Sequence, residues 1–248
     1  MKTLIVANWK CNPTTLQEAK QLFNSVKKGI KNVKNIEVVI CPPFVYLPVL
    51  GTSASAQGFG GLRLGSQDCF WEEKGAFTGE VSSKMLKDFG VEYVIIGHSE
   101  RRRYFNETDE MINKKIKAAL STDLKVIFCV GETLEERNLQ KTEGVINSQI
   151  KNGLKALAET RSLSKLILAY EPVWAIGSGN PCPPLEAKKV GLFIRKTLGK
   201  VPLLYGGSVK AGNAVSYLKE GGFQGFLIGG ASLNPEEFIR LVYNVSKA

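Results

Sequence analysis

The chain of 248 residues contains a single histidine, His98, and only five cysteines, which are widely scattered. A site built from several imidazoles is therefore excluded, and no CxxC or Cys/His spacing typical of zinc is present. An odd number of scattered thiols indicates a reducing compartment rather than a disulfide framework. We therefore expect neither a metal site nor disulfide bonds in this protein.

Long apolar runs and low-complexity segments are also lacking. No run approaches the roughly 18 apolar residues that a membrane-spanning helix requires. The short run at residues 4–7 is interrupted by Asn8-Trp9-Lys10, which argues against a signal peptide. No Gly/Pro/Ser-rich linker divides the chain. These absences predict a soluble, cytoplasmic protein with no membrane contact, folded as one domain over residues 1–248.

Acidic residues are too few to balance the basic ones. The 33 Lys and Arg against 23 Asp and Glu give a formal net charge of +10, so nucleic-acid binding has to be considered. However, the lysines are spread along the chain, and the one dense run, Arg101-Arg102-Arg103, directly follows Glu100. The pattern favours a basic surface that attracts small anions, and we expect no nucleic-acid partner.

Common cofactor and nucleophile motifs are missing. Gly177-Ser178-Gly179 lacks the third glycine of a dinucleotide fingerprint, and Lys196 lacks the preceding glycine of a Walker loop. No nucleophile elbow accompanies His98 and no cysteine adjoins it, which disfavours acyl transfer. The sequence therefore favours neither a dinucleotide site, nor a Walker-type nucleotide site, nor acyl transfer.

Eight continuous apolar runs are present. They span residues 4–7, 38–41, 62–65, 93–97, 126–130, 166–170, 201–205 and 225–228. Continuous rather than alternating runs are typical of parallel strands buried on both faces. Helical patterns lie between them, one opened by a capping box of Thr15 and Glu18, and the last by Asn234 and Pro235. This α/β pattern allows a doubly wound sheet or a (β/α)8 barrel, and the count of eight favours the barrel.

Chemically active side chains follow several of these runs. The first run leads into Asn8-Trp9-Lys10, the fourth into His98-Ser99-Glu100, and the sixth into Glu171. Because barrel active sites lie at the C-terminal ends of the strands, these groups should face one mouth. Pro172 stops the sixth strand, and the small residues 177–179 that follow are typical of a lid over an acid. The alternative is a strand-end glutamate in a surface ion pair.

Glycine pairs follow the seventh and eighth runs, in Gly206-Gly207-Ser208 and Gly229-Gly230-Ala231. Such pairs can simply form tight turns, but their N–H groups at successive strand ends also suit a phosphate. With the groups above, this indicates proton chemistry on a small phosphorylated molecule. A carboxylate would take a proton next to a carbonyl, while imidazole and ammonium stabilise the enediolate oxygens.

Seven blocks of this sequence resemble triosephosphate isomerases, in order and over essentially the whole chain. They are NWK at residues 8–10, GAFTGE at 75–80, VIIGHSERR at 94–102, CVGE at 129–132, YEPVWAIG at 170–177, YGGSV at 205–209 and GGASL at 229–233. The resemblance implies a (β/α)8 barrel that interconverts dihydroxyacetone phosphate and D-glyceraldehyde 3-phosphate without a cofactor, in glycolysis and gluconeogenesis.

The resemblance also implies roles for individual residues. Glu171 would be the base, strengthened when the lid closes and desolvates it, and His98 a neutral electrophile in front of the helical turn at Ser99. Lys10 would supply a fixed positive charge, and Asn8 would provide an orienting hydrogen bond. Glu100 would hold the network around Lys10 and His98. Backbone N–H groups would hold the phosphate at Gly177, Ser208, Gly229 and Gly230.

Family members act as dimers, and the loop around Thr78 resembles the one that enters the neighbouring subunit's pocket. Phe77 would then be an exposed aromatic that the partner covers; the alternative is a loop packed on itself. Two departures from the family are evident. Asn180-Pro181-Cys182 stands where Lys-Thr-Ala is usual, which predicts altered lid opening. Asp68 stands where Asn is common, which puts the detailed polarity of the interface near Lys10 in doubt.

Three alternatives remain open at this stage. A Schiff-base aldolase would need a lysine at a central strand end, but Glu171 occupies the sixth and Lys10 belongs to the first. An anion- or RNA-binding protein would use the +10 charge and show steep salt dependence. An inactive relative with an intact fold is disfavoured because Lys10, His98 and Glu171 are all present.

Overall fold

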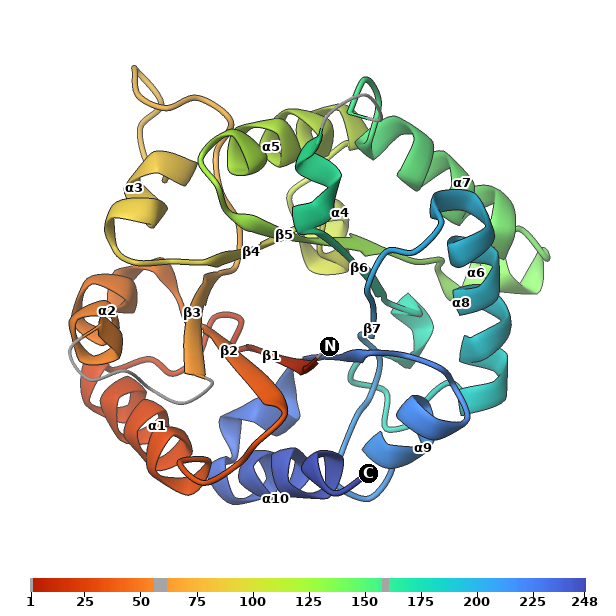
Figure 1. The fold of residues 1–248 in the computed structure, drawn as a ribbon. Helices are drawn as coiled ribbons and strands as arrows, with labels where there is room; N and C mark the ends of the chain where they lie inside the picture. Colours follow the sequence, from red (N-terminus) through yellow and green to blue (C-terminus); the bar gives the residue numbers. More distant parts are fainter. Residues whose placement is uncertain (1, 56–61, 158–160) are drawn as a thin grey trace.

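The eight apolar runs form eight parallel strands that pair in chain order, and β1 also pairs with β8 to close the ring (Figure 1). The strands are β1 (Thr3–Asn8), β2 (Ile36–Cys41), β3 (Leu62–Ser66), β4 (Tyr93–Ile96), β5 (Lys125–Val130), β6 (Leu166–Tyr170), β7 (Leu203–Tyr205) and β8 (Gly225–Ile228). This computed structural model describes residues 2–55, 62–157 and 161–248. The predicted (β/α)8 barrel is confirmed, and the doubly wound sheet is excluded.

Helices surround the ring of strands (Figure 1). They are α1 (Leu16–Gly29), α2 (Leu47–Ser55), α3 (Ser83–Asp88), α4 (Ser99–Tyr104), α5 (Asp109–Ser121), α6 (Leu134–Asn138), α7 (Thr142–Gly153), α8 (Pro184–Leu198), α9 (Ala214–Lys219) and α10 (Pro235–Ser246), with short 3-10 turns η1 (Phe44–Tyr46), η2 (Arg161–Lys165), η3 (Val173–Ala175) and η4 (Gly230–Leu233). The capping box of Thr15 and Glu18 is confirmed, and the Asn234 side chain accepts from the Glu237 N–H at 3.0 Å.

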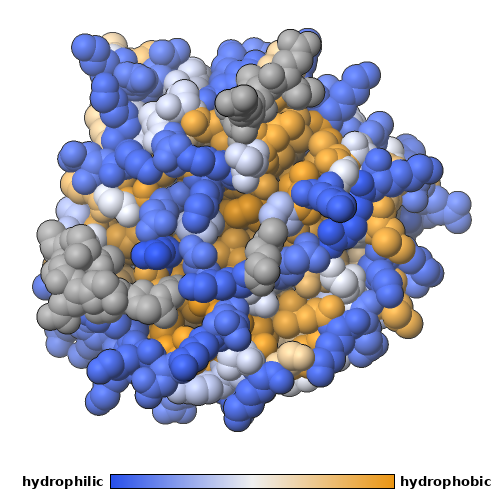
Figure 2. All heavy atoms as spheres, in the orientation of Figure 1, coloured by the Kyte–Doolittle hydropathy of each residue, from blue (hydrophilic) through white to orange (hydrophobic). Residues whose placement is uncertain are grey.

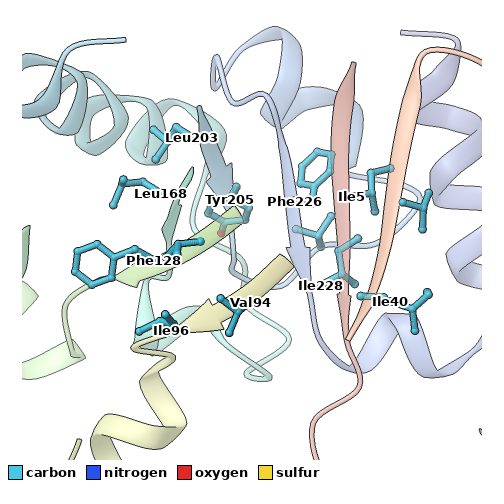
Figure 3. Packing of buried hydrophobic residues seen from close by; sticks show 14 of the residues in the cluster. Ile5, Ile40, Val94, Ile96, Phe128, Leu168, Leu203, Tyr205, Phe226 and Ile228 are labelled. Carbon is cyan, nitrogen blue, oxygen red and sulfur yellow. The ribbon is translucent and has the colours of Figure 1, made fainter. Parts of the chain in front are cut away.

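Two apolar layers hold the barrel together. Alternate strand residues such as Val6, Ile95 and Ala169 fill the barrel interior in one buried cluster. The residues between them pack outward against the helices, and Figure 3 shows part of this second layer, including Ile5 and Phe128. Because both faces of each strand are buried, the strands read as continuous apolar runs.

Two strands are shorter than the sequence predicts. The seventh run starts at Val201, but β7 begins at Leu203, because Pro202 has no N–H to donate to a neighbouring strand. The fourth run includes Gly97, but β4 ends at Ile96. Gly97 turns the chain with a φ of 76°, a conformation that favours glycine. This turn directs the next residues, His98 and Ser99, across the mouth of the barrel.

Hydrophilic side chains cover much of the face shown in Figure 2, and apolar atoms are visible toward its centre. Within the described residues, every helix is too short or too polar to cross a bilayer. Large apolar side chains are nevertheless exposed near the loop at Thr78 and the two helices that follow it. They include Phe77, Met85 and Phe105.

Candidate active site

The inward register of the strands delivers two polar side chains to the mouth of the barrel. Asn8 lies two residues beyond Val6, and Glu171 two residues beyond Ala169, both of which face the interior. Both polar side chains are buried. They line one cavity of about 830 Å³, together with Lys10 and His98. The strand period alone therefore brings an amide and a carboxylate into the same site.

Lys10 is fixed by contacts on both its backbone and its side chain. Its φ is 55°, in the left-handed region. Its N–H donates to Asn8 Oδ1 at 3.1 Å, and its carbonyl accepts from Gln67 Nε2 at 2.8 Å. Its Nζ donates to Glu100 Oε1 at 2.6 Å. These contacts hold the Lys10 ammonium in place at the wall of the cavity.

His98 is held at both ring nitrogens. It caps α4, and its Nδ1 accepts from the Glu100 N–H at 3.2 Å. Its Nε2 lies 3.0 Å from Glu171 Oε1. An acceptor at Nδ1 places the proton of the neutral ring on Nε2, which faces the cavity. The backbone of α4 therefore selects the tautomer that can donate toward a substrate.

Glu171 is paired rather than free in this structure. Its Oε2 accepts from the Ser99 N–H at 3.1 Å, and its Oε1 contacts His98. Burial acts to raise the pKa of Glu171, but His98, the Ser99 amide and the Cys129 thiol together hold it below its ordinary value. The strengthened base expected beneath a closed lid is therefore not the state seen here.

The contact between Glu171 and His98 shifts the pKa of His98 in the opposite direction, upward. Burial acts to lower the pKa of His98, but the carboxylates of Glu171 and, more weakly, Glu100 raise it above the ordinary value of imidazole. The two largest effects that raise it both come from Glu171. The charge of the imidazole thus depends on where the Glu171 side chain lies.

The loop after Glu171 has a fixed N-terminal part and an exposed tip. In the N-terminal part, the Trp174 Nε1 donates to Glu132 Oε1 at 2.9 Å, and the Val173 N–H donates to the Glu132 carbonyl at 3.1 Å. At the tip, Gly177 and Gly179 are exposed and have φ values of 66° and 74°. The predicted division into a rigid beginning and a small-residue middle matches this geometry.

The glycine pairs line the other end of the same cavity. Gly177, Ser208, Gly229 and Gly230 all contribute to its wall. A Cβ added to Gly229 would lie 3.0 Å from Lys10 Cε, and one added to Gly206 would lie 2.8 Å from Glu171 Cγ. The backbone therefore approaches the Lys10 and Glu171 side chains closely at these two glycines, most tightly at Gly206. Bare backbone at this end leaves N–H groups accessible to an anion.

The structure brings nearly all the predicted site residues to one cavity. Glu100 reaches the site through Lys10 and His98 rather than lining the wall. Sequence reasoning missed the Cys129 thiol and the carboxamide of Gln67. Cys129 could have been found from its inward register, two residues after Ile127. Among the described residues, no group of three or more His, Cys, Asp and Glu is arranged to hold a metal.

Asp68 does not alter the polarity around Lys10 directly. Its carboxylate lies 2.7 Å from Lys115 Nζ and 2.8 Å from Arg101 Nε, and Lys115 also pairs with Glu107 at 2.6 Å. We call these four residues the Asp68 cluster. The contact with Lys10 comes instead from the neighbouring residue, Gln67.

Comparison with known proteins agrees with the resemblance found in the sequence. The sequence model of the family described as triosephosphate isomerase matches residues 3–245. The triosephosphate isomerase of Endomicrobium trichonymphae is 45% identical over 97% of this chain and 98% of its own length. That of Aquifex aeolicus (strain VF5) is 45% identical over 98% of this chain and all of its own. That of Alkaliphilus oremlandii (strain OhILAs) is 44% identical, with coverage of 97% and 98%.

Proposed function

The chain belongs to the triosephosphate isomerase family, and we propose that it interconverts dihydroxyacetone phosphate and D-glyceraldehyde 3-phosphate through an enediolate. It is thus an aldose–ketose isomerase. One observation carries the proposal for its site. The buried carboxylate of Glu171, the single imidazole and a fixed ammonium meet in one cavity whose far end is bare glycine backbone.

Glu171 is the base. In the free protein its carboxylate rests on His98 and on the Ser99 amide. To act, it leaves these partners for the substrate carbon, removes a proton from C1 or C2, and returns it to the neighbouring carbon. Leaving its partners removes the contacts that lower its pKa, whereas burial, which raises it, remains. The base therefore becomes stronger as it reaches the substrate.

His98 is the electrophile. Once Glu171 has left, the main cause of the raised imidazole pKa is gone, while burial still lowers it. The ring is then neutral, with Nδ1 accepting from the Glu100 N–H and Nε2–H facing the substrate oxygens. It donates in turn to the two oxygens on which negative charge develops.

Lys10 supplies the fixed positive charge beneath the enediolate, and Asn8 orients the substrate from the same wall. The Glu100 carboxylate holds the Lys10 ammonium, so that the charge is in place before the reaction begins. The backbone N–H groups of Gly177, Ser208, Gly229 and Gly230 bind the phosphate. Lid closure at Gly177 then excludes water and strengthens each of these contacts.

In the cell, this reaction serves glycolysis and gluconeogenesis, and we place the enzyme in the cytoplasm. Its partner in catalysis is a phosphorylated triose, with no cofactor, nucleic acid or membrane. The basic net charge of +10 favours approach of the anionic substrate.

We further propose that two copies form a homodimer, with the Thr78 loop of one reaching the pocket of the other. Thr78 is exposed, and so are the apolar side chains of Phe77, its neighbour in the chain, and of Met85 and Phe105 further along the chain. In sedimentation, the wild type should have twice the chain mass of 27.2 kDa. Thr78→Arg should shift it toward the monomer and lower activity. A wild type that sediments as a monomer would reject this assembly.

The deciding experiment measures isomerisation of glyceraldehyde 3-phosphate by the wild type and by Glu171→Gln. Loss of the base should lower kcat by three or more orders of magnitude, about 4 kcal/mol of transition-state stabilisation. Glu18→Gln, at the remote cap of α1, should keep wild-type activity because glutamine can also cap. An equally fast Glu171→Gln would assign the base elsewhere, and a slow wild type would contradict the proposed reaction.

A further inference from the structure

The C-terminal end of the lid is tied to the barrel by a tyrosine for which the reaction gives no role. Tyr217 lies on α9, and its hydroxyl donates to the Cys182 carbonyl at 2.6 Å. Both residues are buried, with relative exposures of 1% and 0%. The contact joins positions 35 residues apart in the chain. It fixes the peptide at which the lid returns to the barrel.

The Tyr217 ring cannot easily move away from this contact. It stacks on the Tyr205 ring at a centroid distance of 4.0 Å and an interplanar angle of 14°. The Tyr205 ring in turn meets Phe223 edge-on at 5.4 Å. Tyr205 belongs to β7, directly before the glycine pair at the phosphate end of the cavity. The hydroxyl thus links the lid to the strand that carries part of the phosphate site.

The backbone around Cys182 has little torsional freedom of its own. Pro181 and Pro183 fix φ on both sides, and a residue before proline is restricted to extended conformations. In contrast, Gly177 and Gly179 have positive φ values in the exposed tip. The stiff end and the adaptable tip are therefore only a few residues apart.

The opposite end of the lid is also held, through the contacts of Val173 and Trp174 with Glu132. Ala175 is held as well, since its carbonyl accepts from the Ser208 hydroxyl at 2.6 Å. Between these anchors and Cys182 lie residues 176–180. The lid is therefore held at both of its ends in this structure.

We propose that Tyr217 is a positioning residue for lid closure. Its hydroxyl makes Cys182 a fixed pivot, so that each closure returns the Gly177 amide to the same place over the phosphate. This inference rests on the proposed function, because it assigns the lid a phosphate to cover. The hydroxyl touches no substrate and acts only through the lid.

Tyr217→Phe tests the pivot because it keeps the stacked ring and removes only the hydroxyl. Deuterium uptake of the lid peptide should rise severalfold, while uptake of the barrel strands is unchanged. Affinity for 2-phosphoglycolate, a phosphorylated carboxylate resembling the enediolate, should fall roughly fivefold, because the peptide released at Cys182 has to be ordered again when the lid closes. kcat/KM for glyceraldehyde 3-phosphate should fall by the same factor.

Tyr93→Phe is the matched control. The Tyr93 hydroxyl is also part of a hydrogen-bonded pair, donating to Glu37 at 2.6 Å, but it lies at the N-terminal end of β4, away from the lid. This variant should lose a similar amount of thermal stability and keep the wild-type affinity and lid exchange. A merely structural role for Tyr217 would make the two variants alike, which would overturn the proposal.

Pro181→Thr sharpens the test. Freeing φ at position 181 leaves the Tyr217 contact as the main restraint on the pivot, so Tyr217→Phe should cost more in this background than in the wild type. Additive effects would overturn the proposal. If the wild type failed to isomerise triose phosphates, the proposed function would fall, while lid exchange would still decide whether Tyr217 holds the pivot.

Discussion

Two ionic clusters in this barrel have similar ingredients and different consequences. The site cluster contains Lys10, His98, Glu100 and Glu171, and the Asp68 cluster contains Asp68, Arg101, Glu107 and Lys115. Each combines two carboxylates with two basic side chains near the C-terminal ends of strands. The site cluster borders a cavity of about 830 Å³, whereas no member of the Asp68 cluster lines that cavity. Access, rather than the presence of paired charges, separates the proposed catalytic cluster from the Asp68 cluster.

The two clusters also treat a buried carboxylate in opposite ways. Burial raises the pKa of Asp68 to about 6, an effect that Lys115 and Arg101 offset only in part. Glu171 is as deeply buried, but its contacts with His98, Ser99 and Cys129 lower its pKa. Of these contacts, the one with His98 faces the cavity and can be exchanged for a substrate. A contact that a ligand can replace therefore distinguishes the proposed base, Glu171, from Asp68.

The largest effect should come from removing the cation at the centre of the Asp68 cluster. Lys115→Met leaves two buried carboxylates with Arg101 alone, which should cost about 3–5 kcal/mol of stability. For a chain of this length, the thermal midpoint should fall by on the order of 10 °C. Activity per folded molecule should be unchanged. Lys114→Met, which removes an exposed pair with Glu110 on the same helix, should change the midpoint little.

Lys10→Met should give the reverse result. Loss of the fixed charge beneath the enediolate should lower kcat/KM by about 10²–10³. The thermal midpoint should change little, because the Lys10 side chain is partly exposed and its partner Glu100 can be solvated. Kinetics and calorimetry on the two methionine variants together test the comparison. The contrast between the two clusters would be contradicted if Lys115→Met kept its thermal midpoint but lost kcat/KM. It would also be contradicted if Lys10→Met lost thermal stability but kept kcat/KM.

The smallest expected effect is a change in pH dependence. The pKa of Asp68 is about 6 in the folded protein against an ordinary value of 3.8, so the folded state binds the proton more tightly. Asp68 therefore costs stability as pH rises from about 4 to 6. Asp68→Asn should remove this cost, so its thermal midpoint relative to the wild type should rise across that window.

Asp88→Asn, at an exposed carboxylate, is the control for this measurement. If the midpoint of Asp68→Asn instead fell relative to the wild type as pH rose, the ion pairs would outweigh burial at this position. Asp68 would then resemble Glu171 rather than contrast with it.

Much of the barrel could be predicted from the sequence because each strand is buried on both faces. The same register argument places Asn8 and Glu171 at the mouth. The boundaries were less predictable where a single residue overrides the apolar pattern, as Pro202 and Gly97 do. Lysine is a residue normally expected at the surface, and only the fold shows that Lys115 is buried beside Asp68. The pivot at Tyr217 depends on contacts across 35 residues, which no local pattern records.

The first and last strands of the barrel meet at the candidate active site. Lys10 follows β1 and Gly229 follows β8, and their near contact exists only after these strands have paired. A nascent chain that lacks its last strand has Lys10, His98 and Glu171 but no closed ring to bring them to one point. Because synthesis runs from the N-terminus, catalytic power should appear late and abruptly. Recovery of turnover during refolding would then time the moment at which the barrel shuts.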